Sequence, residues 1–347
     1  MILYTYIVYK NEMTFNPENL PYLNPSNDRR VVVITGGNTG VGYFTVLQLY
    51  LHGYIVYIAA RGKSRVMKSI KELKENATKL RLKYTSHQSS SERFLGELHF
   101  LEIDLVNLKS VLNAVETFRK LESELNILIN NAGVMALPFS LTQDNFEIQL
   151  QTNYVSPFLL TLKLLPLLEK TADAYPNKGP PRVVHLSSIG HQFAFRYINM
   201  NSTFNYTPNF IFTWFRYGLA KTASIHFMKM LALRNPKILC LSVHPGFVMN
   251  ANLFSYWTRL PIIGIMFWCL FQIFGWLFGV SSEEGAYSTV KCCLDPGLSL
   301  EKDNGKYFAT GGIEAEPSKV ARNMDYAAKS WIWTIHQLSE RGISIGN

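Results

Sequence analysis

The chain has 347 residues, which suits one large α/β domain with extensions better than two equal domains. Hydrophobic residues make up 48% of the sequence and charged residues 17%, so a sizeable core can form. The net charge of +9 fits an anionic membrane surface or a phosphate-bearing ligand. Nucleic acid is disfavoured as a partner, because Lys and Arg form no consecutive block and no zinc-finger or RNA-binding signature accompanies them.

The cysteines and histidines indicate neither a disulfide framework nor a metal site. Cys240, Cys269, Cys292 and Cys293 contain no CxxC pair, and the adjacent Cys292 and Cys293 cannot form an ordinary bridge. The eight histidines are scattered without the spacing of metal ligands. We therefore expect a reducing compartment and no bound metal.

Strand-like and helix-like segments alternate from Val31 onward. Buried strands are expected at 31–35, 54–60, 97–104, 125–130, 182–187 and 238–243, with helical stretches between them and one further strand near the end. This alternation predicts a single Rossmann-type, doubly wound parallel sheet of about seven strands with helices on both faces. Residues 1–29 precede it and form an N-terminal extension that either packs on the surface or touches a membrane.

A glycine-rich turn follows the first predicted strand. The segment TGGNTGVG leads from that strand directly into a helix, so backbone N–H groups and the helix N-terminus can approach a pyrophosphate. A glycine-rich turn without a ligand is the alternative. The candidate cofactor-binding residues here are Gly36, Asn38, Thr39, Gly40, Val41 and Gly42.

Basic residues follow the second predicted strand, where NAD-dependent enzymes usually place a carboxylate. Arg61 and Lys63 stand there with Arg65 close behind, and a guanidinium can bind a 2′-phosphate that a carboxylate would repel. The sequence therefore favours NADP(H) over NAD(H), although these cations could also be a solvated helix start. Asp104 and Leu105, at the end of the third strand, are expected to meet the adenine edge.

The residues that can take part in catalysis follow the ends of the later strands. Asn131, Ala132 and Gly133 end the fourth strand, where small and amide side chains can line a cofactor crevice. Asn153 lies in a long helical stretch and Ser188 closes the fifth strand. Tyr217 and Lys221, four residues apart, are expected to open a helix and to share one face of it.

This order of residues predicts acid–base chemistry on a nicotinamide cofactor. An unperturbed Tyr has a pKa of about 10, and the Lys221 ammonium together with the positive nicotinamide ring can lower the pKa of Tyr217 by a few units. Lys221 can also bond the nicotinamide ribose. Ser188 would hold the substrate oxygen near Tyr217, and Asn153 would fix a water that links Lys221 to solvent.

Taken together, TGGNTGVG, NNAG, Asn153, Ser188 and YGLAK resemble the short-chain dehydrogenase/reductase superfamily over roughly residues 30–310. Within it, the AAR and HPGFV segments resemble the retinol dehydrogenase and WW-domain oxidoreductase-like group. The resemblance implies that Pro245, Gly246 and Val248 pack near the nicotinamide. It also implies a hydroxyl where this chain has Asn250, which can still hydrogen-bond. The dehydrogenase domain is expected to span 30–347.

Aromatic residues crowd the stretch between Ser188 and Tyr217. The functional interpretation is a wall for a bulky apolar substrate, and the alternative is a surface insertion with its own small cluster. The residues are Phe193, Phe195, Tyr197, Phe204, Tyr206, Phe210, Phe212, Trp214 and Phe215.

A hydrophobic segment at 253–282 lies inside the predicted domain. Simple spanning is disfavoured, because a single crossing would place the last helix and strand on the wrong side of the bilayer. Breaks are expected at Pro261, Gly264, Gly275 and Gly279, and the tryptophans (257, 268 and 276) suit a membrane interface. We expect a hairpin or an in-plane element that associates with a membrane or lipid droplet. A substrate lid and a dimer interface are the alternatives.

The sequence thus predicts an NADP(H)-dependent oxidoreductase that interconverts an alcohol and a carbonyl on a retinoid-, sterol- or fatty-aldehyde-like substrate. A looser resemblance to fungal lipid-droplet members of the superfamily implies a lipid droplet, or the cytosolic face of the endoplasmic reticulum or vacuole, as its location. A homodimer is left open. The rival hypothesis is a non-catalytic NADP(H)-binding scaffold or sensor that affects lipid-droplet or vacuole morphology.

Overall fold

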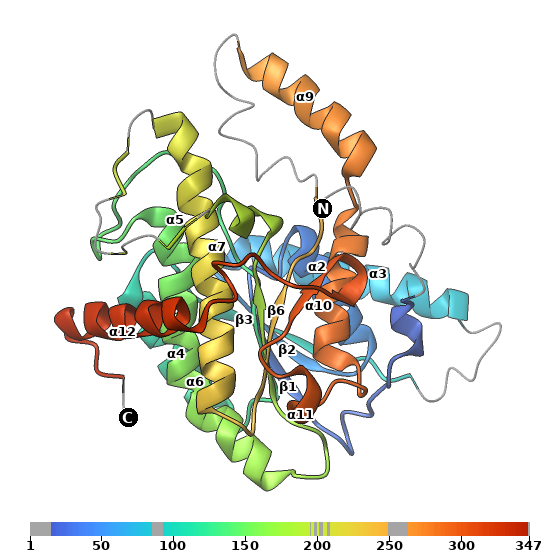
Figure 1. Ribbon diagram of the computed structural model, residues 1–347. Helices are drawn as coiled ribbons and strands as arrows, with labels where there is room; N and C mark the ends of the chain where they lie inside the picture. Colours follow the sequence, from blue (N-terminus) through green and yellow to red (C-terminus); the bar gives the residue numbers. More distant parts are fainter. Residues whose placement is uncertain are drawn as a thin grey trace.

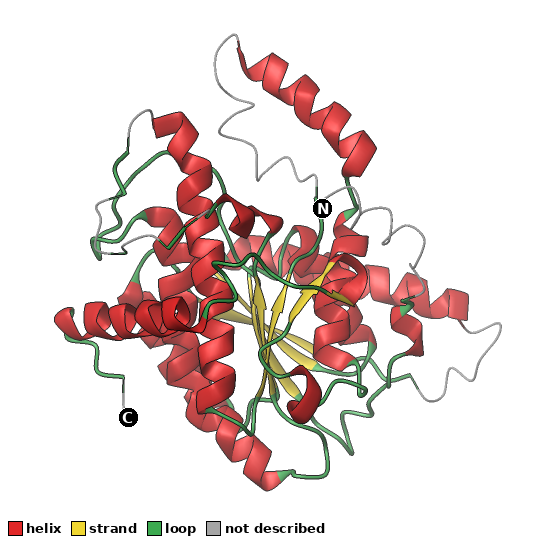
Figure 2. Cartoon of the chain, in the orientation of Figure 1, coloured by secondary structure: helices red, strands yellow, loops and turns green. Residues whose placement is uncertain are grey.

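The computed structural model describes residues 15–84, 93–194, 196–197, 200, 204–206, 209–248 and 263–345. A central sheet lies between two layers of helices (Figures 1 and 2). The strands are β1 (Val31–Thr35), β2 (Ile55–Ala60), β3 (Glu97–Glu102), β4 (Ile127–Asn130), β5 (Arg182–Leu186), β6 (Leu239–Val243), β7 (Tyr307–Ala309) and β8 (Ile313–Glu314).

The helices follow the predicted alternation. The α-helices are α2 (Gly40–Leu51), α3 (Lys63–Tyr84), α4 (Leu108–Leu121), α5 (Ile148–Leu150), α6 (Ser156–Ala174), α7 (Asn209–Arg234), α9 (Ile263–Phe278), α10 (Ser282–Leu294), α11 (Leu300–Asp303) and α12 (Met324–Glu340). The short helical elements are η1 (Pro17–Asn19), the π-helical η3 (Gln151–Val155), η4 (Ile189–Phe193) and η5 (Thr310–Gly312).

The sheet has the strand order β3-β2-β1-β4-β5-β6-β7-β8. Its first seven strands are parallel, and β8 pairs antiparallel with β7 through Ala309 and Ile313. The predicted parallel sheet is therefore confirmed, with one two-residue strand beyond the expected seven. The chain order reverses between β1 and β4, and at such a switch point the carboxyl ends of the strands form a ligand-binding crevice.

Apolar side chains on both faces of the sheet explain why the strands read as continuous hydrophobic runs. One core lies between the sheet and the layer of α4, α6, α7 and α12, with Phe118, Phe158 and Phe227 at its centre. The other lies beneath α2, α3 and α10 and contains Val46 and Leu73. Both layers leave the carboxyl edge of the strands accessible.

The described part of the N-terminal extension packs on the domain surface. Leu20 is buried, and His52 contacts the carbonyl of Pro17 through Nε2 at 3.0 Å. The Arg29 guanidinium donates two hydrogen bonds to Glu122, at 2.8 and 2.6 Å. Residues 15–29 are thus anchored to the domain.

Helix α9 stands away from the other described elements and is joined to α10 by residues 279–281 (Figure 1). It is one continuous 16-residue helix without a charged residue, so the break expected at Gly275 is wrong. Gly264 lies in its first turn, and the helix ends just before Gly279, where a break was expected. The hairpin stays a prediction, because residues 249–262 fall outside the described residues. Ile265 is 74% exposed and Trp268 53%. Among the described residues no helix has the length and apolarity to cross a membrane. The expectations for Asn250, Trp257 and Pro261 fall outside the described residues.

Candidate active site

A cavity of about 1280 Å³ opens at the carboxyl edge of the sheet, at the switch point. Of the predicted site residues, only Lys63 and Asn153 are absent from its lining. The predicted residues that line it are Gly36, Asn38, Thr39, Gly40, Val41, Gly42, Arg61, Asp104, Leu105, Asn131, Ala132, Gly133, Ser188, Tyr217, Lys221, Pro245, Gly246 and Val248.

The glycine-rich turn fits a pyrophosphate. Gly36 has a φ of +67°, and a Cβ there would lie 3.0 Å from Cβ of Ala132. A Cβ on Gly42 would lie 2.4 Å from the Gly36 carbonyl oxygen, so a side chain at either position would disrupt the turn. Thr39, the N-cap of α2, makes no capping hydrogen bond through its side chain. The helix N-terminus therefore offers its N–H groups and its dipole to an anion in the cavity.

Thr35 and Asn131 join the ends of β1 and β4. The Thr35 hydroxyl accepts hydrogen bonds from the backbone N–H groups of Asn131, at 3.1 Å, and Ala132, at 3.0 Å. Asn131 Nδ2 in turn donates to the Thr35 carbonyl at 2.8 Å. Sequence reasoning did not single out Thr35, although a polar residue that ends a buried apolar strand is a usable signal.

Cations line the cavity beyond β2. Arg61 is 63% exposed, and its Nε lies 3.9 Å from Oδ1 of Asp104. Arg65 folds over Gly62, where an added Cβ would lie 2.8 Å from the Arg65 Nε. Lys63 begins α3 as an exposed residue outside the cavity wall. The structure thus brings Arg61 and Arg65 to the site, and Lys63 faces elsewhere.

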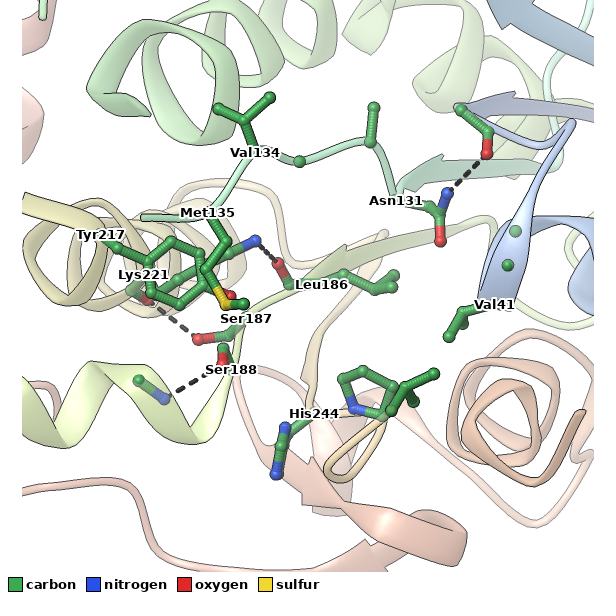
Figure 3. A pocket seen from close by; sticks show the side chains of 18 of the residues that line it. Val41, Asn131, Val134, Met135, Leu186, Ser187, Ser188, Tyr217, Lys221 and His244 are labelled. Atoms are coloured by element: carbon green, nitrogen blue, oxygen red, sulfur yellow. Dashed lines mark hydrogen bonds between the residues drawn. The ribbon is translucent and has the colours of Figure 1, made fainter. Parts of the chain in front are cut away.

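Tyr217 and Lys221 lie on one face of α7 (Figure 3). The helix begins at Asn209, two turns earlier than predicted, and so includes the aromatic residues just before Tyr217. Lys221 Nζ donates to the Leu186 carbonyl at 2.7 Å and lies 5.8 Å from the centre of the Tyr217 ring. Ser187 donates to the Lys221 carbonyl at 3.0 Å, so β5 and α7 are joined at the reactive pair.

In the protein without cofactor, burial is the main cause of the pKa shifts of Tyr217 and Lys221. It raises the pKa of Tyr217 to about 12, opposed by a hydrogen bond with Ser188, and it lowers the pKa of Lys221 to about 7. Removal from water disfavours both the phenolate and the ammonium. The expected lowering of the Tyr217 pKa depends on a bound nicotinamide ring, so it stays a prediction.

Ser188 sits in a turn that packs on the Tyr217 ring. Its Oγ accepts a hydrogen bond from the Gly190 N–H at 3.0 Å (Figure 3). A Cβ on Gly190 would lie 2.6 Å from Cε1 of Tyr217, so only glycine allows this approach. The serine hydroxyl and the phenol ring are therefore brought together on the same wall of the cavity.

Asn153 lies behind the cavity wall, in the π-helical turn η3. Its side chain makes two 2.8 Å hydrogen bonds with the backbone of Val134, and its carbonyl accepts from His185 at 3.1 Å and Ser224 at 3.2 Å. A Cβ on Gly133 would lie 3.0 Å from Asn153 Oδ1. Asn153 therefore fixes the wall beside Lys221, and its role in a water relay stays a prediction.

The aromatic stretch divides into two parts. Phe193 and Trp214 line the cavity and contact each other edge to face, with ring centres 6.0 Å apart. Phe195 and the Phe210 side chain lie outside the described residues. The others pack away from the cavity, as the alternative interpretation expected: Tyr197 on Tyr326, Phe204 in the core, and Tyr206, Phe212 and Phe215 on one another.

Several lining residues were not predicted as site residues, although His244 belongs to the HPGFV segment. His191 and His244 reach the cavity from η4 and from the end of β6. Residues 313–316 close another part of the wall after a tight turn in which Gly311 and Gly312 have positive φ. Only the folded chain brings these distant segments together.

Comparison with known proteins places these features in a family. The model of the short chain dehydrogenase family matches residues 30–258. The short-chain dehydrogenase/reductase drtF of Aspergillus calidoustus is 33% identical over 340 residues, which cover 93% of this chain and 98% of the relative. Retinol dehydrogenase 12 of Homo sapiens is 33% identical over 305 residues, which cover 87% of this chain and 84% of the relative.

Solved structures share the fold. A protein from Mycobacterium Paratuberculosis superposes with a TM-score of 0.62 at 22% identity, covering 94% of this chain and 97% of its own. RhlG of Pseudomonas aeruginosa, solved as an NADP active-site complex, superposes with a TM-score of 0.57 at 21% identity and covers 82% of this chain and 95% of its own. The chain therefore belongs to the short-chain dehydrogenase family of oxidoreductases, which act on alcohol and carbonyl groups, and within it to the retinol dehydrogenase-like group.

Proposed function

We propose that this protein is an NADP(H)-dependent oxidoreductase that interconverts an alcohol and a carbonyl on a lipophilic substrate at a lipid-droplet or membrane surface. The observation that carries this proposal is one cavity lined by the glycine-rich turn, Ser188, Tyr217 and Lys221. A phosphate-binding end and a proton-transferring end in one cavity are what a nicotinamide-linked reaction requires.

The residues present fit a phosphorylated nicotinamide cofactor. The N-terminus of α2 would hold its pyrophosphate, and Arg61 and Arg65 would bind its 2′-phosphate. Tyr217 and Lys221 would meet the nicotinamide ribose, with Pro245 to Val248 beside the ring. When bound, this group supplies or accepts the hydride at the substrate carbon.

Tyr217 would move the proton. Because its pKa is about 12, the phenol is protonated at neutral pH and can donate to the substrate oxygen during reduction. In the reverse direction Tyr217 must first be deprotonated, and its phenolate would then accept the proton, stabilised by the charge of the Lys221 ammonium. The Ser188 Oγ accepts from Gly190 and also makes a hydrogen bond with Tyr217, and a bound substrate oxygen would take the place of Tyr217 as the acceptor of the Ser188 hydrogen.

The cavity favours a bulky apolar substrate. Its volume of about 1280 Å³ can take a cofactor and a second ligand together. Phe193, Trp214, Met135 and Leu137 contribute apolar side chains to its lining. A retinoid, sterol or fatty aldehyde would bury its hydrocarbon there while its oxygen meets Ser188 and Tyr217.

Helix α9 supports a location at a lipid surface. Its exposed apolar residues include Ile265, Met266 and Ile273, the first of them 74% exposed, and their burial in lipid would be favourable. Just beyond α9, Val280 lines the cavity and forms a β-bridge with Val248. An apolar substrate could therefore enter the cavity from the lipid phase to which α9 binds.

Replacing Tyr217 with Phe removes the proton donor and keeps the ring that packs on Gly190. We expect kcat for NADPH-dependent reduction of retinal, decanal or a ketosteroid to fall by about a hundredfold or more. Tryptophan fluorescence titration should show that NADPH still binds, with its Kd raised by no more than about tenfold for the lost contact with the ribose. Survival of the reductase activity would contradict the role of Tyr217 in proton transfer. A cellular lipid-droplet effect that persists in the inactive variant would favour the non-catalytic scaffold.

Replacing Arg61 with Ala should weaken NADPH much more than NADH, because only NADPH carries the 2′-phosphate. We expect the Kd for NADPH to rise about tenfold and that for NADH to change less than about twofold. Lys63→Ala is the matched control, since it removes a neighbouring exposed cation outside the cavity. Equal losses for both cofactors would contradict the NADP(H) assignment.

Replacing Lys221 with Met should abolish activity and yet stabilise the cofactor-free protein. The pKa of Lys221 is about 7 in the fold against 10.5 ordinarily, so the folded chain carries the full cost of a buried ammonium below pH 7. That cost falls as pH rises from 7 towards 10.5. Urea denaturation should show a gain of a few kcal/mol at pH 6, reduced by the lost Leu186 hydrogen bond, and a smaller gain at pH 9. A gain independent of pH would contradict this account.

Replacing Ile265, Met266, Trp268 and Ile273 together with Gln should release the protein from lipid. Flotation with phosphatidylcholine vesicles and with isolated lipid droplets measures this. The control replaces Leu233 and Ile332, which are 69% and 64% exposed elsewhere, and should float as the wild type does. Unchanged flotation of the α9 variant would direct attention to the N-terminal extension. Loss of a dimer without loss of flotation would assign α9 to a dimer interface.

A further inference from the structure

Two histidines form hydrogen bonds with the backbone of the turn at Ser188. His244 reaches it from the end of β6, and His191 lies within η4, directly after the turn. Both line the cavity, and both are buried, at 7% and 1% exposure. The proton transfer described above does not involve either ring.

His244 anchors the turn from the sheet. Its Nδ1 accepts a hydrogen bond from the Ile189 N–H at 3.2 Å, which requires a neutral ring with its hydrogen on Nε2. Burial lowers the pKa of His244 to about 3, so the ring stays neutral. Its own backbone N–H donates to Phe308 at 2.8 Å, which ties the end of β6 to β7. Figure 3 places the imidazole beside Ser188.

His191 anchors the turn from the C-terminal segment. Its Nδ1 lies 2.6 Å from the Ser188 carbonyl, which can only accept, so Nδ1 carries the hydrogen. Nε2 then accepts from the Ser318 N–H at 3.0 Å. The two histidines thus require opposite tautomers. Ser318 closely follows the segment 313–316 that lines the cavity.

The turn has little room to move. A Cβ added to Gly190 would lie 2.6 Å from the Tyr217 ring. A Cβ added to Gly218 would lie 2.6 Å from the Gly190 carbonyl oxygen. Packing therefore resists a shift towards α7. The bonds to His244 and His191 resist a shift in the other directions, so together they determine where the Ser188 hydroxyl stands relative to Tyr217.

We propose that His244 and His191 are positioning residues that hold the Ser188 turn against Tyr217 and so set the placement of the substrate oxygen. This inference rests on the proposed function, because Ser188 and Tyr217 must first be the groups that meet that oxygen. A misplacement of about 1 Å can cost a reaction about a hundredfold in rate. Neither imidazole exchanges a proton with the substrate in this account.

Substitutions of His244 by Asn and Gln distinguish the roles of its two ring nitrogens. His244→Asn places an amide oxygen near the former Nδ1, where it can accept from Ile189, and His244→Gln places its amide further out, near the former Nε2. With saturating NADPH and decanal, we expect kcat of His244→Asn to stay within about threefold of wild type. His244→Gln and His244→Leu should lose about tenfold or more, with an unchanged Kd for NADPH.

His191 provides the complementary pair. His191→Asn can still donate to the Ser188 carbonyl and should retain more activity than His191→Gln, which can keep only the bond to Ser318. Equal kcat values for Asn and Gln at both positions, or full activity of His244→Leu, would overturn the inference. The NADPH-binding stoichiometry shows whether each variant is folded. If His244→Leu does not fold, the comparison of the Asn and Gln variants decides the outcome.

Ser188→Ala and Tyr217→Phe are measured in parallel. Full activity in both would contradict the proposed function itself. Loss of activity in both, with every histidine variant fully active, would contradict only the positioning role.

Discussion

The hydrogen bonds between Thr35 and Asn131 are the constraint on which the site depends. They join the ends of β1 and β4, at 2.8 to 3.1 Å, where the chain order of the sheet reverses. Because the helices that follow these strands lie on opposite faces, a crevice must open between them. The glycine-rich turn occupies one side of that crevice and the Tyr217 helix approaches from the other. The cavity is thus a consequence of topology, and the side chains determine its chemistry.

Much of the fold and the site could be predicted because each rests on a local pattern. Buried parallel strands read as β-branched runs, and Gly36 and Gly42 stand where the backbone allows no Cβ. Tyr217 and Lys221 share a helix face through their spacing alone. The family match over residues 30–258 agrees with these patterns.

The rest depends on tertiary packing, which spacing does not encode. In the chain without cofactor, the direction of the Tyr217 pKa shift follows from burial, which the spacing of Tyr217 and Lys221 does not reveal. His244 meets the turn after Ser188 only because β5 and β6 are neighbours in the sheet, and His191 meets Ser318 only in the folded chain. Helix α9 continues through Gly275 because one glycine weakens a helix without ending it.

The central claim is that this cavity brings a nicotinamide and a lipophilic carbonyl together for hydride transfer. The most direct test incubates the purified protein with retinal and decanal and with NADPH deuterated at C4 on either face, followed by mass spectrometry of the alcohols. The account predicts deuterium at the carbinol carbon from one face of the cofactor only. NADPH binding without deuterium in any alcohol would contradict it.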